Sequence, residues 1–395
     1  MVRGKFAALL GGVALLYLIV TWSGSDLLPE ARNIADMKLM RTMAVDDGGD
    51  RQVTVTVSGD VQKDGPSDST RPPILLTQSG RTVFGTCVRL KEDSEGFLEF
   101  GHLAECVVGE DYARAGIEDL CDYLERDVST RLETKLFVVR GETGESALRG
   151  AGSENTAITD SLFSISQNPS FGGRYWPYTV REYFSGQEDN GLSLLPVLKL
   201  EDNRDYDPEN PAAQPEKTVR LAGLALMEED KLTAYLTEEE SRGVSLLTGN
   251  DKTDPFEVPL SDGTVAGIQL TETKCRWEPV FDPEGNLTAL TARLEVKGDL
   301  DQFSGDWSEE MLREMERGFS DQVRTSAQAA LDRSQKEGAD FLHIRRELMC
   351  VCPLKASRLQ TNWDSWFPTL ELKAEATGEI MRSYDIDRPG VSNGE

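Results

Sequence analysis

The sequence predicts an α/β (α+β) protein with several domains, in which helices pack on mixed sheets after an N-terminal membrane helix. Three observations lead to this prediction. Strand-like and helix-like patterns alternate over residues 51–141, an acidic segment divides the chain at 201–217, and a long amphipathic helix lies among alternating strands in the second half. A chain of 395 residues is long enough for two or three domains that each bury a core.

Residues 1–25 are predicted to form a signal-anchor or transmembrane segment. A basic tip that contains Arg3 and Lys5 precedes an uncharged apolar run over 6–20, an order typical of a signal sequence or an anchor. The two cations should stay cytoplasmic, which places the rest of the chain on the extracytoplasmic side. Small residues at 23–25 would also permit cleavage, so a cleaved signal remains the alternative to the favoured retained anchor.

The charge of the chain limits its partners. Its 42 basic and 69 acidic residues give a net charge of −27. A surface of this charge repels phosphate backbones and anionic lipid headgroups, so we expect no nucleic-acid partner. Hydrophobic residues make up 38% of the sequence, which indicates a folded body and not a disordered chain.

The first half of the chain shows both the two-residue alternation of strands and the helical repeat of apolar residues. Valines alternate with polar residues over 51–57, which indicates a strand with one buried face. The next segments predict an amphipathic helix over 79–91, a strand over 95–108, a helix over 110–127 and a strand over 134–141. We expect the buried face of the first helix to consist of Val83, Phe84, Cys87 and Val88.

Residues 201–217 are the predicted linker between an N-terminal domain, 30–200, and a C-terminal domain, 218–387, which may itself subdivide. The linker has three prolines, many acids and no large aliphatic residue. The C-terminal domain is predicted to contain strands over 219–227, 265–280, 287–298 and 369–380, and a helix over 306–338.

The helix predicted at 306–338 has the strongest signals in the chain. Asp306 or Ser308 can cap its start and Gly338 can end it. Its apolar stripe is formed by Met311, Met315, Phe319, Val323, Ala327, Ala330 and Leu331. We interpret the segment as a helix laid across a sheet, in preference to a coiled-coil or partner-binding helix.

The stretch 100–112 contains the residue types of a metal or nucleophile site. We expect His102 to lie in a strand with its side chain on a packed face, together with Cys106, and Glu110 and Asp111 to open a helix. A Cys-His pair would need the fold to bring in His343 from the other half of the chain.

The six cysteines could form disulfides in an exported protein, but their surroundings argue against it. Cys87 and Cys121 resemble small core residues, whereas Cys350 and Cys352 are too few for a closed zinc site. The usual phosphate-binding, zinc-protease and serine-hydrolase motifs are missing from the sequence. We therefore predict no catalytic, cofactor-binding or metal-binding residues and no cofactor.

Two separate blocks of the sequence carry a recognisable pattern. The first block contains Gly80, Thr82, Phe100, Gly101, His102, Ala113, Arg114, Gly116, Ile117, Arg126 and Asp127. The second contains Asp340, Trp363, Asp364, Phe367 and Pro368. With these residues the two blocks resemble the GerAC, or Ger(x)C, family, the C subunits of spore germinant receptors. Members usually carry a lipidated cysteine after the signal segment, whereas the first cysteine here is Cys87, so the apolar segment would have to serve as the anchor.

The resemblance implies a non-enzymatic, membrane-tethered subunit of a germinant receptor in the spore inner membrane. It also implies A-type and B-type membrane subunits as partners and a role in receptor assembly or signalling during nutrient-induced spore germination. Two alternatives from other classes stay open at this point. One is a free extracytoplasmic binding protein, and the other is a cell-envelope hydrolase that uses a carboxylate pair.

Overall fold

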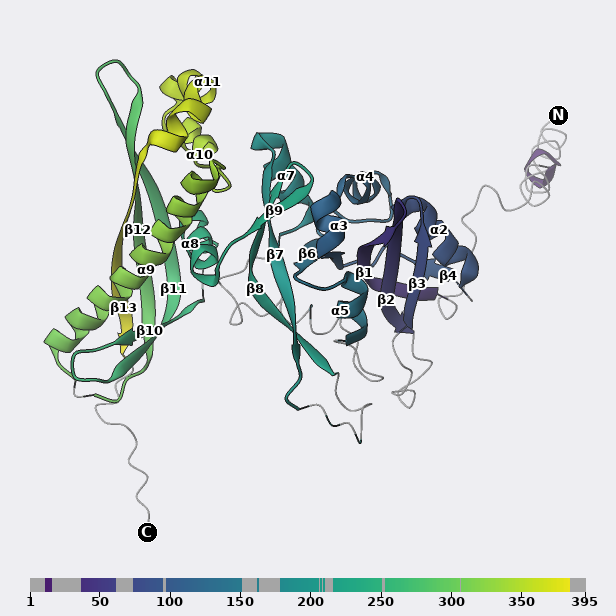
Figure 1. The fold of residues 1–395 in the computed structure, drawn as a ribbon, viewed down its shortest axis with the longest axis horizontal. Coiled ribbons are helices and arrows are strands. Elements are labelled where there is room, and N and C mark those ends of the chain that lie inside the picture. The colour runs from purple at the N-terminus through teal and green to yellow at the C-terminus, as the bar shows by residue number, and fades with distance from the viewer. Residues whose placement is uncertain are drawn as a thin grey trace, which may run out of the picture.

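The computed structural model describes residues 11–15, 37–61, 74–94, 97–150, 162, 178–205, 207, 209, 216–250, 253–305 and 307–383. These residues form two bodies that lie side by side, each built on its own sheet (Figure 1). The mixed α/β architecture with more than one body confirms that part of the predicted fold class. Within the described part of the chain, no helix is long and apolar enough to cross a bilayer. The predicted segment at 1–25 lies outside the described residues, apart from a helical piece at 11–15.

The first body is built on a nine-stranded sheet in the order β3-β2-β1-β5-β6-β7-β8-β9, with the short β4 also paired to β1. The strands are β1 (Met37–Gly49), β2 (Gln52–Val61), β3 (Ile74–Gly80), β4 (Phe97–Glu99), β5 (Glu105–Gly109), β6 (Lys135–Val139), β7 (Leu192–Asp202), β8 (Lys217–Glu228) and β9 (Lys231–Tyr235). Strands β1, β5, β6 and β7 are parallel, and antiparallel strands flank them on both sides. The parallel strands carry continuous apolar runs because both of their faces are covered.

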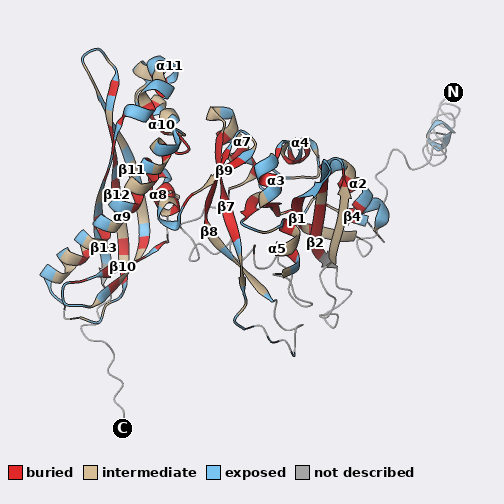
Figure 2. Cartoon of the chain, in the orientation of Figure 1, coloured by how far each residue is buried: buried red, intermediate tan, exposed pale blue. Residues whose placement is uncertain are grey.

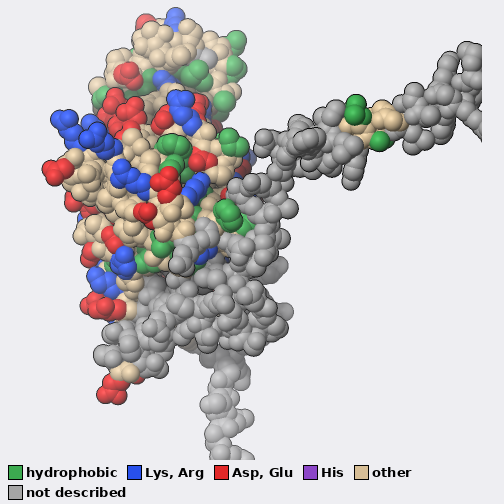
Figure 3. Space-filling model, turned by 90° about the vertical axis from the view of Figure 1, so that its right-hand side faces the viewer, with side chains coloured by type: hydrophobic (Ala, Val, Ile, Leu, Met, Phe, Trp, Pro, Cys, Tyr) green, Lys and Arg blue, Asp and Glu red, His purple; other side chains and the backbone are tan. Residues whose placement is uncertain are grey.

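Helices cover both faces of this sheet. They are α2 (Val83–Asp93), α3 (Glu110–Ala115), α4 (Glu118–Arg126), α5 (Gly144–Gly150) and α7 (Val180–Asn190). Helices α2, α3, α4 and α7 share one core with the sheet. Helix α5 packs on a smaller core at the opposite face. The buried residues therefore concentrate in the central strands (Figure 2). On the outside, acidic and basic side chains are interspersed with scattered hydrophobic ones, as the side view shows (Figure 3).

The second body is a four-stranded sheet with one long helix across it. Its elements are α8 (Glu238–Thr248), β10 (Pro255–Pro259), β11 (Val265–Phe281), β12 (Leu287–Gln302), α9 (Glu309–Glu337), α10 (Ile344–Val351), α11 (Ala356–Trp366) and β13 (Glu371–Ser383). Ser308 caps α9 through its hydroxyl, and Gly338 ends the helix in the left-handed conformation. The predicted stripe packs on the sheet, which confirms the interpretation of this segment.

Helix α9 also contacts both edges of its sheet. At the β13 edge, the Gln328 side chain accepts a hydrogen bond from the backbone N–H of Ala374 at 2.8 Å. At the β10 edge, the Gln322 amide donates to the carbonyl of Glu257 at 2.7 Å. Edge strands expose unpaired backbone groups that can pair with other chains. Side chains of α9 form hydrogen bonds with several of these groups.

The sheet of the first body continues across the segment that was predicted to be a linker. Strands β7 and β8 pair antiparallel from Leu192 opposite Glu228 to Asp202 opposite Lys217. The two strands thus form a hairpin whose connection contains most of residues 201–217. The first sheet consequently takes strands from both predicted domains, and the division of the chain at 201–217 stays a prediction.

Two predicted elements are split in the structure. The strand predicted at 95–108 is interrupted by a turn, in which Leu103 N–H donates to the carbonyl of Phe100 at 3.0 Å and both side chains are buried. The prediction that His102 faces a packed surface is therefore wrong, since His102 lies exposed in this turn. The helix predicted at 110–127 breaks at Gly116, whose φ of 129° is open to glycine and unfavourable for other residues.

The predicted buried face of α2 is also partly wrong. Val83 and Cys87 are buried as expected, together with Thr86 and Leu90. Phe84 instead points outward and is 63% exposed. The stripe at positions 83, 86, 87 and 90 has regular helical spacing, and Phe84 lies one position off it.

Asp46 holds α5 against the sheet from a distant part of the chain. Its buried carboxylate accepts hydrogen bonds from the backbone N–H groups of Gly144 at 2.6 Å and Glu145 at 2.8 Å. The burial raises the pKa of Asp46 above its ordinary value. These bonds satisfy N–H groups in the first turn of α5, which have no partner within the helix.

Asp46→Ala should lower the free energy of unfolding by about 1–2 kcal/mol, because it removes this cap. Urea denaturation at neutral pH, followed by circular dichroism, measures the change. Asp47→Ala is the control, since Asp47 is exposed and bonds only to the nearby Gly49 N–H among the described contacts. Equal losses in the two variants would contradict the assigned role of Asp46.

Candidate functional site

The junction between the two bodies contains a partly buried group of charged side chains. Asp189, at the end of α7, accepts hydrogen bonds from the Arg345 guanidinium on its carboxylate Oδ1 at 3.1 Å and on its backbone carbonyl at 2.7 Å. Its other carboxylate oxygen lies 2.8 Å from Nδ1 of His343. The side chains of Asp189 and Arg345 are only 17% and 19% exposed, so the ion pair is largely shielded from water.

Asp340 organises the segment that carries His343 and Arg345. Its buried carboxylate accepts hydrogen bonds from the backbone N–H groups of Ile344 at 2.9 Å and Arg345 at 3.0 Å, and so begins α10. Burial raises the pKa of the Asp340 carboxyl. The Asn190 side chain donates to the Asp340 carbonyl at 2.8 Å, which ties α7 to the same turn.

A cavity of about 340 Å³ lies beside this junction. It is bounded by the end of α7, the turn between β8 and β9, the end of α9 and the helices α10 and α11. Asp340, Trp363, Asp364 and Phe367, from the second resemblance block, all line it. Trp363 and Phe367 stack with ring centroids 5.3 Å apart. Residues that are separated in the sequence thus meet at one place between the bodies.

A shared hydrophobic core holds the two bodies together behind these polar contacts. Leu192 and Leu194 of β7 belong to the same buried cluster as Val244 of α8 and Phe319 of α9. Alternate residues of β7, such as Leu195, face the core of the first body instead. Because β7 contributes to both cores, a displacement of one body strains the packing of the other.

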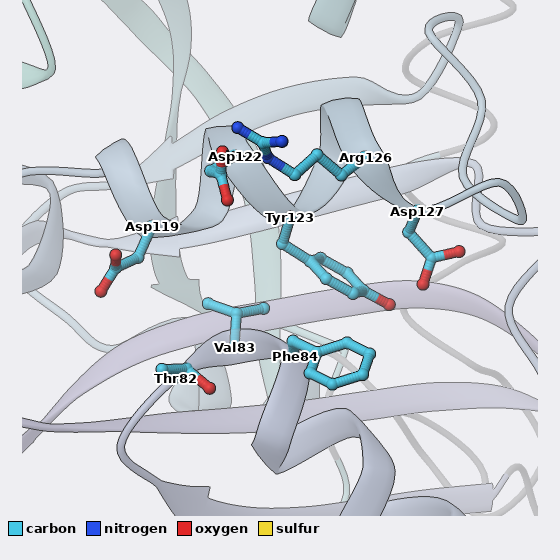
Figure 4. A pocket seen from close by; sticks show the side chains of 8 residues that line it. All are labelled: Thr82, Val83, Phe84, Asp119, Asp122, Tyr123, Arg126 and Asp127. Carbon is cyan, nitrogen blue, oxygen red and sulfur yellow. Dashed lines mark hydrogen bonds and ion pairs between the residues drawn. The ribbon is translucent and has the colours of Figure 1, made fainter.

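A second cavity, of about 410 Å³, lies on the first body between α2 and α4. Figure 4 shows the exposed Phe84 beside the ring of Tyr123, with carboxylates around them. The cavity is lined by Thr82, Val83, Phe84, Asp119, Asp122, Tyr123, Arg126 and Asp127. Thr82, Arg126 and Asp127 belong to the first resemblance block. Three of the matching residues of this block therefore lie together at one surface.

The structure does not assemble a Cys-His pair from the predicted candidates. Cys106 is fully buried in the first body, and this burial raises the pKa of its thiol, which disfavours the nucleophilic thiolate. His343 lies at the junction and bonds to Asp189. All six cysteines are free thiols. Across the described residues, no group of three His, Cys, Asp or Glu side chains is arranged to hold a metal ion.

Two family profiles match this chain in succession. The profile described as "Spore germination protein N-terminal domain" matches residues 30–200, and that described as "Spore germination B3/ GerAC like, C-terminal" matches residues 222–384. The fold and these matches together define a spore germination protein. The chain belongs to the GerAC family, which confirms the family predicted from the two sequence blocks.

A relative agrees with this assignment, and a solved structure has a similar fold. The chain is 19% identical to the "Putative spore germination protein YfkR" of Bacillus subtilis (strain 168) over 320 residues, which are 79% of this chain and 78% of the relative. The fold is similar to the "Crystal Structure of the GerBC protein", with a TM-score of 0.56 and 15% identity. That likeness covers 86% of this chain and 97% of the other.

Proposed function

We propose that this chain is a non-enzymatic, membrane-tethered subunit of a spore germinant receptor. In this proposal its body lies on the extracytoplasmic side of the spore inner membrane and docks on the A-type and B-type membrane subunits. It supports receptor assembly or signalling during nutrient-induced germination. Membership in the GerAC family supports the class, and the apolar segment at 6–20 supports the tether.

The observation that carries the proposal is the junction between the two bodies. The ion pair of Asp189 and Arg345 and the core shared through β7 hold both bodies in one orientation. A rigid body of this kind can pass a displacement from one partner to another without transforming a substrate. Four residues of the second block line the cavity at this junction, and three residues of the first block line the α2/α4 cavity, which supports a role of both places in contacts with partners.

The carboxylates around the α2/α4 cavity do not favour a hydrolase. A glycosidase-like pair needs one acid with a raised pKa as the proton donor. Although burial by itself would raise the pKa of Asp127, hydrogen bonds from Ser129 hold it below its ordinary value. Asp122 pairs with Arg126 at 2.6 Å, on the exposed side of α4.

Deleting the gene should abolish nutrient-triggered release of dipicolinate from spores of the source organism, while a trigger that bypasses the receptor still works. A complemented strain is the control and should recover the response. Unchanged release in the deletion strain would contradict a required receptor role. Fractionation of the same spores tests the tether: recovery of the chain outside the membrane fraction would favour a free extracytoplasmic binding protein.

A further inference from the structure

An exposed aromatic side chain lies beside the α2/α4 cavity on an ordered helix. Thr82 caps α2 by accepting a hydrogen bond from Gly85 N–H at 3.1 Å, and the buried stripe of the helix anchors it to the sheet. Phe84 is therefore held outward, 63% exposed, and lines the same cavity as Tyr123 (Figure 4). Val128, two residues beyond the end of α4, is also fully exposed. An aromatic side chain that is held exposed beside a cavity can serve as the anchor of a protein contact.

The charges around Phe84 determine which partner fits. Asp119, Asp122 and Asp127 line the cavity together with a single cation, Arg126. The Arg126 guanidinium already pairs with Asp122, so the cavity retains an excess of negative charge. A partner that brings positive charge would complement this surface. Anionic lipid headgroups would be repelled by it and by the net charge of −27 of the chain.

The position of this surface relative to the start of the body also matters. The chain enters the first sheet at Met37, which pairs with Phe97 of β4, and β4 contacts α2 (Figure 1). Residues 1–36, which include the predicted anchor, precede this point. The described body thus begins beside β4, which contacts the helix that carries Phe84.

We propose that the α2/α4 face, defined by Phe84, Asp119, Asp122, Tyr123, Asp127 and Val128, binds a basic segment of a membrane subunit of the receptor. An apolar side chain of that segment packs between Phe84 and Tyr123, and neighbouring Lys or Arg residues pair with Asp119 and Asp127. This inference rests on the proposed function and names the contact by which the chain would join the receptor.

The test compares two variants with two matched controls in the full chain, in spores. Phe84→Ala removes the aromatic anchor, and the double variant Asp119→Lys/Asp122→Lys reverses the rim charge. Leu354→Ala is the control for the first, because Leu354 is fully exposed on the second body. Glu125→Lys is the control for the second, because Glu125 is exposed on α4 and does not line the cavity. Thermal unfolding of each purified variant verifies that it folds.

The readout is the amount of tagged A-type and B-type subunits that co-precipitate from solubilised spore membranes. We expect each test variant to lower recovery of one subunit by about tenfold or more, as for loss of an interface anchor, and the controls to leave it unchanged. Recovery by the wild-type chain should also fall as the salt concentration rises. Normal recovery by both test variants would contradict binding at the α2/α4 face, but it would not contradict the proposed function. Failure of the wild-type chain to recover either subunit would overturn both.

A photo-crosslinking amino acid at position 84 identifies the occupant. The expected product joins this chain to a segment of the A-type or B-type subunit that contains Lys or Arg beside an apolar residue. A crosslink to a second copy of this chain, or to residues 1–36 of the same chain, would assign the face to a different occupant and overturn the proposal.

Discussion

Gly243→Ala is expected to lower the free energy of unfolding by about 2–3 kcal/mol, because α8 crosses α9 in direct backbone contact at this glycine. A Cβ atom at position 243 would lie 1.9 Å from the carbonyl oxygen of Ser326 and 2.8 Å from Cβ of Ala330. Both neighbours belong to α9, so relief requires the helices to move apart. The better helix propensity of alanine, about 1 kcal/mol, opposes this loss and is smaller than the steric cost.

Chemical denaturation of the purified protein, followed by circular dichroism, measures this loss. Gly150→Ala is the matched control, since a Cβ atom at the end of α5 would lie 3.4 Å from the flexible Lys217 side chain, an ordinary contact. We expect the control to change the free energy of unfolding by less than about 1 kcal/mol. A Gly243→Ala protein as stable as the wild type would mean that α8 and α9 are not in the close contact described here.

Asp189→Ala is expected to lower the free energy of unfolding by about 3 kcal/mol and to loosen the junction between the two bodies. The substitution leaves the Arg345 guanidinium, 19% exposed, without its carboxylate partner, and it also removes the partner of His343. Removing one member of a largely buried pair is costly, since the remaining charge stays desolvated. Arg345→Ala should have a comparable effect, and the double variant should lose less than the sum of the two.

A double-mutant cycle on unfolding free energies gives the coupling energy of Asp189 with Arg345. Glu371→Ala is the control, because Glu371 forms an exposed pair with Lys373 that should contribute less than about 1 kcal/mol. Small-angle X-ray scattering reports the orientation of the bodies, and dipicolinate release from spores reports function. Additive losses, with unchanged scattering and normal germination, would contradict the role assigned to the junction.

Several elements could be predicted from local signals alone. For α9, a capping serine, an apolar residue in every turn and a terminal glycine are all readable in the sequence, and each lies where the structure has it. The alternation of β12 likewise separates the buried Leu290 and Leu294 from the exposed Glu295. These predictions were correct because a single face of each element is buried, so that periodicity reports burial directly.

Other elements were missed or wrongly joined. Strand β1 was not predicted, although it lies in the middle of the first sheet and pairs on both sides. Helix α7 was missed as well, although a capping box of Thr179 with Glu182 and a terminal Gly191 mark its ends. Because Asp189 lies in α7, the junction was missed with it. The turn at His102 was read as a strand, since local alternation does not show that Phe100 and Leu103 must both reach the core.

The order of residues along the chain was sufficient to determine its family, its acidic character, its mixed α/β composition and the longest of its helices. The family follows from the matching residues of the two sequence blocks, and the other properties depend on composition and on contacts within a few residues. The tertiary structure alone decided that Asp189 meets Arg345, that Phe84 faces outward and that β7 serves two cores. Each depends on which distant elements pack together, and periodicity along one element carries no information about its partner.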